Sequence, residues 1–501
     1  MNGRWLGMAV AIGVTVAQTA PVRAGLFNPE TFTLDNGMQV VVIPNHRAPV
    51  VAHWVWYKVG TADSPPGKSG LPHFLEHLMF KATDEIPSGE FSKIVARNGG
   101  NDNAITSYDF TAYFQMIAKD RLELVMGMEA DRMVNLKLTE DVVIPEREVV
   151  IEERRSRVEN EPGSLMSEQL AAIQYLNHPY RLPVIGWMRE MQTYDRHDAV
   201  SFYETWYAPN NAVLVVAGDI TAEELRPMAE RTYGRIAPRD VPARHRVGEP
   251  PQRAERRLEL ADPRVRQPSL VRSWLAPSYT ADPPGVVGAG GGASGAGNAE
   301  TGAPPAAAYA LEVVSELFGR GGTSRLYKAL VVDRPLAAGV GSYYSGTALD
   351  PTSFRIYASP RPGVTLDALE AALDEQVALL VAEGVSEEEL QRVKKRMKAQ
   401  AVYARDSLSG AARTFGAALT TGQTVADVEA WPDRIDAVTV DEANAVIRRV
   451  FVDARSVTGR LVPQAAVEEA GVARDATPSP AAAGDGEAVP AAMDGEGGTA
   501  R

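Results

Sequence analysis

The sequence predicts an α+β fold in which one architecture occurs twice. Both halves of the 501-residue chain begin with strand patterns, continue through helix patterns and end in another patterned segment. This length is sufficient for two to four domains. A polar, proline-containing stretch at 244–259 is the expected linker. We therefore expect an N-terminal domain at 25–245 and a C-terminal domain at 246–463.

The first half carries its clearest strand signal at a hairpin. Residues 32–43 are rich in β-branched and apolar residues around Asn36-Gly37, a dipeptide typical of a tight hairpin turn. Other segments show the continuous apolar runs of buried strands or the Thr-x-x-Glu capping box that begins a helix. These predicted elements are strands at 51–59 and 212–217, and a helix that begins at Thr221-Ala-Glu-Glu224.

The second half combines short strands with long amphipathic helices. Apolar side chains recur at helical spacing, and Ser or Thr stands three residues before Glu at two helix starts, which is the signature of a capping box. The predicted elements are strands at 270–275 and 353–358, a helix at 366–382, and helices that begin at Ser386 and Thr439.

Composition excludes several classes of protein. Asp and Glu outnumber Lys and Arg, which gives a net charge of −13. An acidic chain is a poor nucleic-acid binder, because phosphate backbones need clustered positive charge. There is no cysteine, so disulfides, a cysteine nucleophile and thiolate metal ligands are all excluded. Any metal must be held by histidine and carboxylate side chains.

The first 24 residues have the layout of a secretory signal peptide. They contain two arginines and no acid, with an apolar run between them, and small or apolar residues stand at −3 and −1 of a cut after Ala24. A membrane anchor is the alternative, but the run is shorter than the roughly 20 residues that span a bilayer. No later segment is long and apolar enough to span. We expect a soluble protein of the periplasm or a secreted one.

Two segments lack the apolar content that ordering requires. Residues 283–308 are rich in Gly, Ala and Pro, and we expect them to form an inserted surface loop. Residues 464–501 are rich in Ala, Gly, Pro and acids, and we expect them to be a disordered acidic tail.

The segment His73-Phe-Leu-Glu-His77 carries the sharpest chemical signal. Two histidines four residues apart lie one above the other on a helix, so both imidazoles can reach one metal ion. Glu76 stands beside them and can reach a metal-bound water. This is the H-x-x-E-H order of inverzincins. The alternative is a pair of surface histidines. Apolar residues at helical spacing form the neighbouring stripe of the same helix: Leu71, Phe74, Leu75 and Leu78.

Catalytic zinc usually takes three protein ligands and a water, so a further His or carboxylate is needed. The segment 145–155 predicts a helix with Pro145 in its first turn. Val149 and Val150 lie four and three residues before Glu153, which predicts that Glu153 projects from the apolar face. An ionised carboxylate on a buried face needs a partner.

Other carboxylates on this helix have different expected roles. Glu146 lies two turns before Glu153 on the same face, about 10 Å away along the axis, so both cannot bind one ion directly. Glu148 and Glu152 are expected to face solvent. The alternative is an ordinary salt-bridged helix, since arginines stand at 147, 154 and 155.

Taken together, three motifs resemble the pitrilysin/insulinase family of zinc metallopeptidases, in the bacterial branch similar to mitochondrial processing peptidase. They are HFLEHLMF at 73–80, NDNAITSYDFTAYF at 101–114 and EREVVIEE at 146–153. Weaker matches are HPYR at 178–181, WYAPNN at 206–211 and FGRGGTSRLY at 318–327. The resemblance implies two α/β-sandwich domains of the LuxS/processing-peptidase-like metallohydrolase type, the second a degenerate repeat without the zinc motif.

The resemblance also implies roles for individual residues. His73, His77 and Glu153 would bind one Zn2+ per chain, since the family's third ligand follows the second histidine by about 76 residues, which falls on Glu153. Glu76 would be the general base of a zinc metalloendopeptidase. Glu146 would be the family's auxiliary glutamate, which orients the ligands.

A substrate strand is also expected. Residues 103–114 alternate and predict one continuous strand. In the family, this strand takes an extended peptide substrate as an added strand, which implies substrate contact at Asn103 and Ala104. The alternative is a purely structural strand whose asparagine packs a turn.

One departure from the family concerns an Arg and a Tyr that reach the active site from the later domain. The expected places hold Val331 and Ala338, and neither can donate those hydrogen bonds. Some bacterial relatives divide zinc motif and Arg/Tyr pair between two chains. We therefore expect a heterodimer with a subunit that carries the pair, or else a homodimer. Two alternative functions are a non-catalytic assembly subunit and an exported zinc-binding protein.

Overall fold

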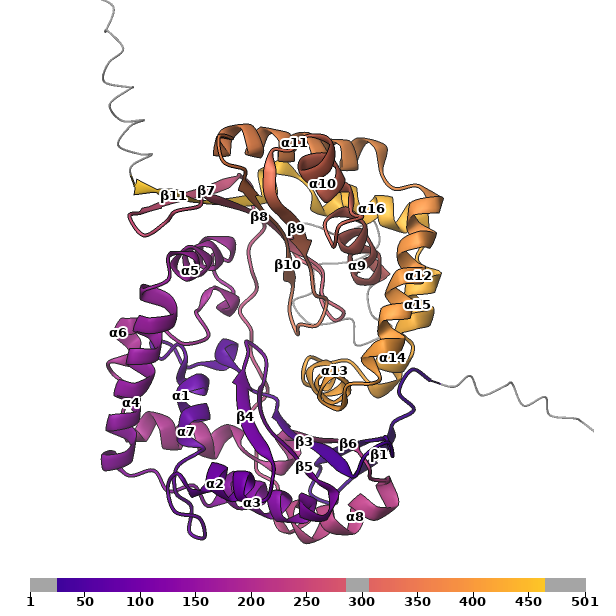
Figure 1. Ribbon diagram of the computed structural model, residues 1–501. Coiled ribbons are helices and arrows are strands. Elements are labelled where there is room, and N and C mark those ends of the chain that lie inside the picture. Colours follow the sequence, from indigo (N-terminus) through magenta and orange to yellow (C-terminus); the bar gives the residue numbers. More distant parts are fainter. Residues whose placement is uncertain (1–24, 285–305, 465–501) are drawn as a thin grey trace, which may run out of the picture.

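The computed structural model describes residues 25–284 and 306–464 and contains two mixed sheets, each packed against helices (Figure 1). The strands of one sheet lie between residues 30 and 218, and those of the other between 256 and 463. This arrangement confirms the predicted α+β fold with two similar units. The expected signal peptide, nearly all of the expected loop, and the expected tail after its first residue lie outside the described residues.

The N-terminal sheet has six strands in the order β1-β2-β6-β3-β5-β4. Neighbours are antiparallel except β2 and β6, which are parallel. The central strands are buried along most of their length, as their continuous apolar runs predict. Strand β4 forms one edge. The strands are β1 (Glu30–Thr33), β2 (Gln39–Pro44), β3 (Val50–Tyr57), β4 (Asn101–Thr106), β5 (Thr111–Ala118) and β6 (Ala212–Gly218).

Helices of the N-terminal half cover one face of this sheet. The apolar stripe of α1 is buried in the core that these helices form with β2, β3 and β6. The predicted hairpin turn and the capping box at Thr221 are both present. The helices are α1 (Leu71–Leu78), α2 (Glu90–Arg97), α3 (Leu122–Val134), α4 (Glu140–Arg154), α5 (Pro162–Gln174), α6 (Met188–Met191), α7 (Arg196–Trp206) and α8 (Ala222–Arg231).

The C-terminal sheet repeats the topology of the first sheet without a counterpart of β1. Its order is β7-β11-β8-β10-β9, with β7 and β11 parallel and the other neighbours antiparallel. Helix α9 follows β8 as α1 follows β3, and it contains no histidine. The strands are β7 (Arg256–Asp262), β8 (Ser269–Ala276), β9 (Ala337–Tyr343), β10 (Thr352–Pro360) and β11 (Ser456–Pro463).

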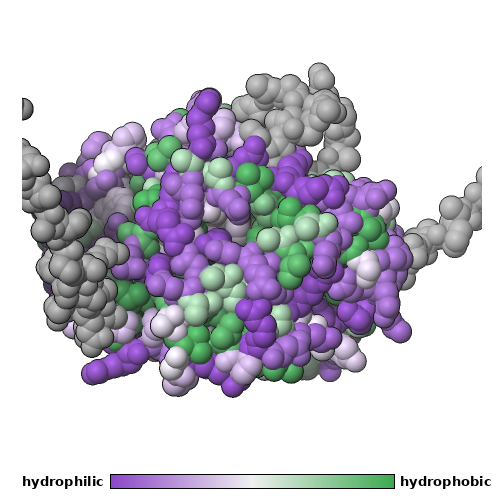
Figure 2. Space-filling view, turned by 90° about the horizontal axis from the view of Figure 1, so that it is seen from above, coloured by the Kyte–Doolittle hydropathy of each residue, from purple (hydrophilic) through white to green (hydrophobic). Residues whose placement is uncertain are grey.

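Long helices pack on one face of the second sheet, and the predicted boxes at Ser386 and Thr439 begin two of them. Seen from above, the outside of this unit carries small apolar patches separated by hydrophilic side chains (Figure 2). The helices are α9 (Ala306–Phe318), α10 (Arg325–Tyr327), α11 (Leu366–Glu383), α12 (Glu387–Ala404), α13 (Leu408–Thr420), α14 (Val425–Glu429), α15 (Trp431–Ala437) and α16 (Val440–Val450).

Each half of the chain contributes one helix that packs on the sheet of the other half. Helix α13 of the C-terminal half packs on β3 and β6 of the first sheet, where Phe415 joins a buried cluster with Trp54 and Trp56. Helix α5 of the N-terminal half packs on β7, β8 and β11, where Met166 joins a buried cluster with Leu461. Figure 1 shows both helices between the sheets. Each sheet is therefore completed by the other half of the chain.

Charged side chains at the junction tie the linker to both halves. The guanidinium of Arg246, which is buried, lies 3.0 Å from Asp63 and 3.2 Å from Asp109. Its other terminal nitrogen lies 4.0 Å from Asp350 in the second half, and His178 lies 3.3 Å from the same carboxylate. Burial raises the pKa of Asp63 to about 6, although the charge of Arg246 opposes the shift.

Three expectations about secondary structure were wrong. Residues 103–114 form two strands, because a turn closed by a 2.8 Å hydrogen bond from the amide of Ser107 to the carbonyl of Phe110 separates β4 from β5. Helix α4 begins at Glu140, with Thr139 as its N-cap and Pro145 in its interior. The acidic first turn after Thr139 was the missed start signal. The expected linker ends early, because residues from 256 onward form edge strand β7.

None of the helices within 25–284 and 306–464 combines the length and the hydropathy that crossing a bilayer requires.

Candidate metal centre

Helix α1 presents two histidines away from its buried stripe. The stripe fixes the rotation of the helix, because Phe74, Leu75 and Leu78 are fully buried. His73 and His77 then point out of the core and stay partly exposed. The helix begins directly after Gly70, whose φ of +82° and close contact with Gly186 leave no room for a Cβ atom.

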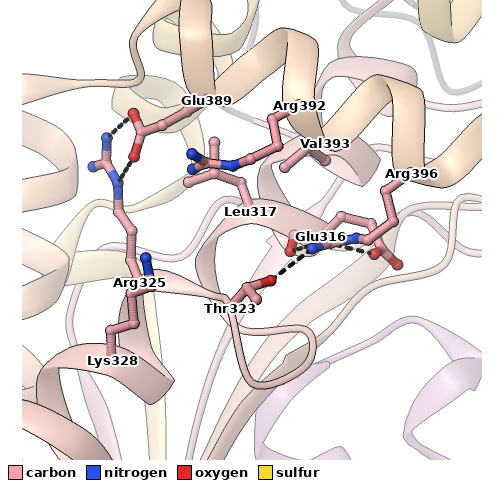
Figure 3. A pocket seen from close by; sticks show the side chains of 9 residues that line it. All are labelled: Glu316, Leu317, Thr323, Arg325, Lys328, Glu389, Arg392, Val393 and Arg396. Carbon is pink, nitrogen blue, oxygen red and sulfur yellow. Dashed lines mark hydrogen bonds and ion pairs between the residues drawn. The ribbon is translucent and has the colours of Figure 1, made fainter.

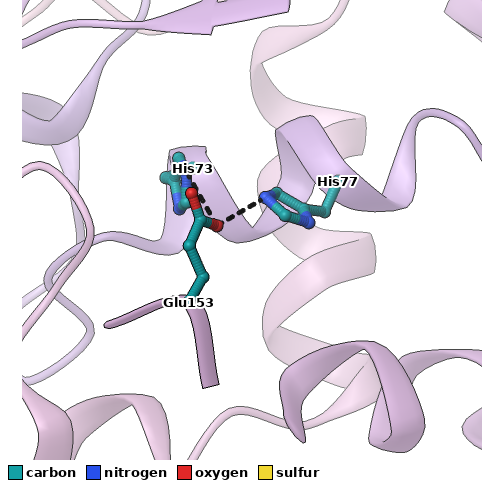
Figure 4. A group of neighbouring side chains, drawn as sticks. All are labelled: His73, His77 and Glu153. Carbon is teal, nitrogen blue, oxygen red and sulfur yellow. Dashed lines mark ion pairs between the residues drawn. The ribbon is translucent and has the colours of Figure 1, made fainter. Parts of the chain in front are cut away.

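Helix α4 brings Glu153 to the same point. Oε2 of Glu153 lies 3.1 Å from Nε2 of His77 and 3.8 Å from Nε2 of His73 (Figure 4). One ligand atom from each of the three residues lies within 4.8 Å of the others. In the part of the chain that the structure describes, this is the one such group of three His, Asp or Glu side chains. The three predicted ligand residues are therefore brought together.

This donor set suits a divalent transition metal. Zinc in catalytic sites takes two histidines and one carboxylate as one of its common ligand sets. Burial lowers the pKa of His73 to about 4, so this imidazole is neutral and free to bind metal. The hydrogen bond from His77 lowers the pKa of Glu153 and keeps it ionised. The residues present thus fit a zinc ion.

His77 responds to the two carboxylates around it. Burial alone would lower its pKa, but hydrogen bonds with Glu146 and Glu153 raise it to about 9. A proton on His77 balances the same negative charge that a bound cation would balance. The site is therefore arranged to hold positive charge between these carboxylates.

Glu146 lies on the other side of His77. Its Oε1 is 3.1 Å from Nδ1 of His77, and its Oε2 pairs with Lys81. A carboxylate at Nδ1 fixes the tautomer that leaves Nε2 as the metal-binding atom. Lys81 was not identified from the sequence, because it lies beyond the end of α1 at Leu78 and no helical spacing links it to His77.

Glu76 is held against the edge strand β4. The hydroxyl of Thr106 donates a hydrogen bond to Oε2 of Glu76. Burial raises the pKa of Glu76, and the bond from Thr106 opposes part of that shift. Thr106 was also missed, because nothing in the sequence shows that the end of β4 reaches α1.

A cavity of about 430 Å³ adjoins these side chains. Ala104 lines the cavity, as a substrate-contact residue should, whereas Asn103 does not and instead accepts a 2.8 Å hydrogen bond from the amide of Ala104. The lining residues come from α1, β4, α4 and the turn after it, α5 and a loop: His73, Glu76, Ala104, Ile105, Thr106, Glu153, Arg157, Val158, Ser164, Glu168, Pro183, Val184 and Ile185.

Other expectations about α4 hold only in part. Glu148 and Glu152 face solvent as predicted. Val150 is buried, but Val149 is 50% exposed, so the expectation that both valines lie on the inward face was wrong. The buried stripe of α4 runs through Val143, Glu146 and Val150. These residues are three and four positions apart, which is helical spacing, so α4 is rotated slightly about its axis from the expected orientation.

A second, smaller cavity of about 80 Å³ lies in the C-terminal half (Figure 3). Two of its arginines are already paired: Arg325 with Glu389, and Arg396 with Glu316. It contains no histidine, and it is a salt-bridged surface pocket rather than a second metal centre.

The positions at which an Arg and a Tyr were sought in the C-terminal half hold Val331 and Ala338. Val331 packs against the second core, and Ala338 is exposed on edge strand β9. Of the polar residues nearby, Arg334 pairs with Glu375, and Tyr344 donates to the carbonyl of Pro277. Tyr343 is exposed.

Two family models match the chain and show the family to which it belongs. The family model described as insulinase (peptidase family M16) matches residues 39–186, and the one described as peptidase M16 inactive domain matches 193–397. The chain belongs to the M16 peptidase family. This result confirms the resemblance to the pitrilysin/insulinase peptidases.

Two similar proteins align with most of the chain. Zinc protease PqqE of Helicobacter pylori is 30% identical over 468 residues, which is 92% of this chain and 98% of that protein. A zinc protease of Mycobacterium leprae that is described as uncharacterized is 28% identical and covers 84% of this chain and 88% of its own length.

Solved structures show the same fold. A protease from Helicobacter pylori superposes with a TM-score of 0.77 at 28% identity, covering 87% of this chain and 99% of that one. A peptidase M16 inactive domain from Pseudomonas fluorescens gives a TM-score of 0.73 at 16% identity, covering 87% and 98%. The two-unit architecture is thus that of the family.

Proposed function

We propose that this chain is a zinc-dependent endopeptidase that hydrolyses peptides or unfolded protein segments, with one Zn2+ per chain. The observation that carries the proposal is the convergence of His73, His77 and Glu153 beside a cavity. His73, Glu153 and Glu76 all line this cavity. Three protein ligands leave a fourth position for water or substrate. Relatives named as zinc proteases support the same conclusion.

The side chains around the metal supply the proton chemistry. Zinc bound there would acidify a water molecule to a pKa of about 7 and polarise the peptide carbonyl. Glu76 reaches the same cavity, and its raised pKa suits a group that accepts a proton near neutral pH and returns it to the leaving amine. Thr106 holds one carboxylate oxygen of Glu76, which leaves the other for proton transfer.

Glu146 has a positioning role in this proposal. It binds Nδ1 of His77 and cannot reach a metal on the Nε2 side of the same ring. Its negative charge makes the imidazole a better donor to the metal.

An extended peptide fits the edge strand β4. Ala104, Ile105 and Thr106 line the cavity at its end, and β4 pairs with a strand on one side only among those described. A substrate added to this edge would be recognised mainly through its backbone. In this arrangement Ala104 contacts the peptide at the cavity, Asn103 contacts it through the exposed strand edge outside the cavity, and folded substrates are excluded.

A second subunit is part of the proposal. Val331 and Ala338 cannot provide the Arg and Tyr that the family uses across the cleft, so we infer a partner chain that carries this pair, or a second copy of this chain. If the purified single chain cleaves peptides as fast as any mixture with a partner, this inference is wrong.

Export is inferred from residues 1–24. The proposed mature protein begins at Gly25, in the periplasm or outside the cell. Amino-terminal sequencing of the protein from a periplasmic extract tests this, and a chain that retains Met1 would contradict it.

The first experiment compares the zinc-loaded chain from Gly25 with its Glu76→Gln variant on an unstructured fluorogenic peptide. Cleavage by the first and a loss of about 100-fold or more in the second would support the proposed chemistry. Equal cleavage by both chains would contradict it. No cleavage by either, with one zinc bound per chain, would direct the search to the missing subunit.

A further inference from the structure

Arg157 occupies a distinctive place at the cavity. It lies in a π-helical turn, Arg155–Glu159, that directly continues α4 beyond the ligand Glu153. Nη1 of Arg157 lies 2.7 Å from Oε1 of Glu153, and 74% of its side chain is exposed. Arg157 also lines the cavity, together with His73 and Glu153.

The π-helical turn explains how Arg157 reaches the cavity. A π turn inserts one extra residue into an α-helix and shifts the residues that follow around the axis. Arg157 and Val158, although consecutive, both line the cavity. The neighbouring Arg155 pairs instead with Glu152 on the solvent side and does not line it. The two arginines of one turn therefore have different surroundings.

Among the charged side chains that line the cavity, Arg157 carries a positive charge that no other group would balance once a divalent ion is bound. Glu168 is taken up by Arg154, which donates to both of its carboxylate oxygens at 2.7 and 3.0 Å. A divalent ion at the proposed metal site would balance Glu76 and Glu153. The remaining formal charge of the lining is then the positive charge of Arg157.

Arg157 also has unused hydrogen-bond donors. A guanidinium carries five N–H groups in a planar fork that matches a carboxylate. In the described chain, Glu153 is the one acceptor paired with Arg157, so most of this fork is open to a ligand. Val158, Val184 and Ile185 provide apolar walls for the carbon atoms of such a ligand.

We infer that Arg157 binds a carboxylate of the peptide substrate next to the scissile bond. The inference rests on the proposed peptidase function and adds a substrate class to it. The carboxylate comes from an Asp or Glu side chain or from the free C-terminus of a short peptide. The competing role for Arg157 is limited to orienting the ligand Glu153.

The test uses one unstructured fluorogenic peptide in matched forms. Glu, Gln or Lys is placed at each position beside the scissile bond, and each peptide is made with a free and an amidated C-terminus. At one position we expect kcat/KM for Glu to exceed that for Gln by about 10- to 100-fold, as for a hydrogen bond to a charged group. A preference that disappears on amidation identifies the C-terminus as the carboxylate.

Variants assign the preference to Arg157. Arg157→Gln should reduce the Glu/Gln ratio to about one, and Arg157→Glu should invert the Glu/Lys preference. Arg155→Gln is the matched control, since it removes a charge from the same turn outside the cavity and should leave the ratio unchanged. A Glu/Gln ratio near one in the native chain would overturn the inference. So would Arg157 variants that keep the Glu/Gln and Glu/Lys ratios of the native chain.

Zinc affinity separates the two roles of Arg157. Chelator competition on Arg157→Gln reports whether Glu153 has lost its orientation. A weakened zinc affinity with an unchanged Glu/Gln ratio assigns Arg157 to metal positioning and overturns the substrate role.

Binding measurements distinguish failure of this inference from failure of the peptidase function. If the native chain with zinc cleaves none of the peptides, the anisotropy of the same labelled peptides is measured with the Glu76→Gln chain. If the Glu peptides bind more tightly than the Gln peptides, and if Arg157→Gln abolishes this difference, the inference is supported without hydrolysis. Equal binding overturns it.

Discussion

Gly416 of α13 lies directly against the indole ring of Trp56 of β3, so closely that a Cβ atom on Gly416 would lie 1.9 Å from Cε2 of the ring. The two residues are 360 positions apart in the chain. Contact at this distance joins a helix of the C-terminal half to the sheet of the N-terminal half. The two units therefore share one of their hydrophobic clusters and are not independent domains.

Replacing Gly416 with alanine should destabilise the chain. Ala normally stabilises a helix interior by about 0.5–1 kcal/mol relative to Gly, but here the methyl group would overlap a fully buried ring. We expect a decrease in the free energy of unfolding of about 1–3 kcal/mol, measured by denaturant titration. Gly127→Ala is the control, because Gly127 lies within α3 with open space around it. A gain in stability for Gly416→Ala would contradict the packing described.

Glu146→Gln should weaken zinc binding while leaving the three ligands in place. The amide cannot carry the charge that now pairs with His77 and Lys81. We expect the zinc dissociation constant to rise about 10- to 100-fold, measured by chelator competition. Glu148→Gln, on the solvent face of the same helix, should change it little. Equal effects of the two variants would show that Glu146 has no particular role.

Removal of metal should lower the thermal stability of the native chain. A ligand that binds the folded state alone at 1,000 times its dissociation constant adds about 4 kcal/mol, so chelation should decrease the melting temperature by several degrees. Differential scanning calorimetry with and without chelator measures this. The Glu153→Gln chain should respond far less, and an identical response would argue that the metal binds elsewhere.

Asp63 should make stability depend on pH. Burial raises its pKa from 3.8 to about 6 in the folded chain, so the folded state binds a proton more tightly than the unfolded state. Its stabilising contribution is full below pH 3.8 and is lost as the pH rises through about 6. Between pH 4 and 7, the free energy of unfolding of Asp63→Asn should therefore increase relative to that of the native chain, by up to about 3 kcal/mol. Urea titrations at several pH values measure the difference, and a difference that is constant with pH would refute the linkage.

The sequence was most informative where local pattern and structure coincide. The spacing of the apolar residues of α1 already fixed which face carries His73 and His77, because a helix that buries one stripe must expose the other. Turn and cap residues marked the hairpin and several helix starts for a similar reason: their chemistry acts within four residues. Glu153 was chosen mainly through the resemblance to a known family, whose third ligand follows the second histidine by about 76 residues. The argument from its helix face was only partly right, because Val149 is exposed.

The wrong predictions concern sequence patterns that are compatible with two local structures. Pro145 was placed in a first turn, which it tolerates best, although the helix starts at Glu140 and accommodates Pro145 in its interior. The alternation at 103–114 continued through a turn, because residues on both sides of a short hairpin turn follow the same period of two.

By itself the sequence determined the two-unit α+β architecture and the helix that carries H-x-x-E-H, and its resemblance to a known family pointed to Glu153 as the third ligand residue. Only the tertiary structure decided that Thr106 holds Glu76 and that Arg157 lines the cavity. The same is true of α5 and α13, each of which covers the sheet of the opposite half of the chain. These contacts join segments tens to hundreds of residues apart. No periodicity encodes them, because they depend on how separate elements pack rather than on the conformation of any one of them.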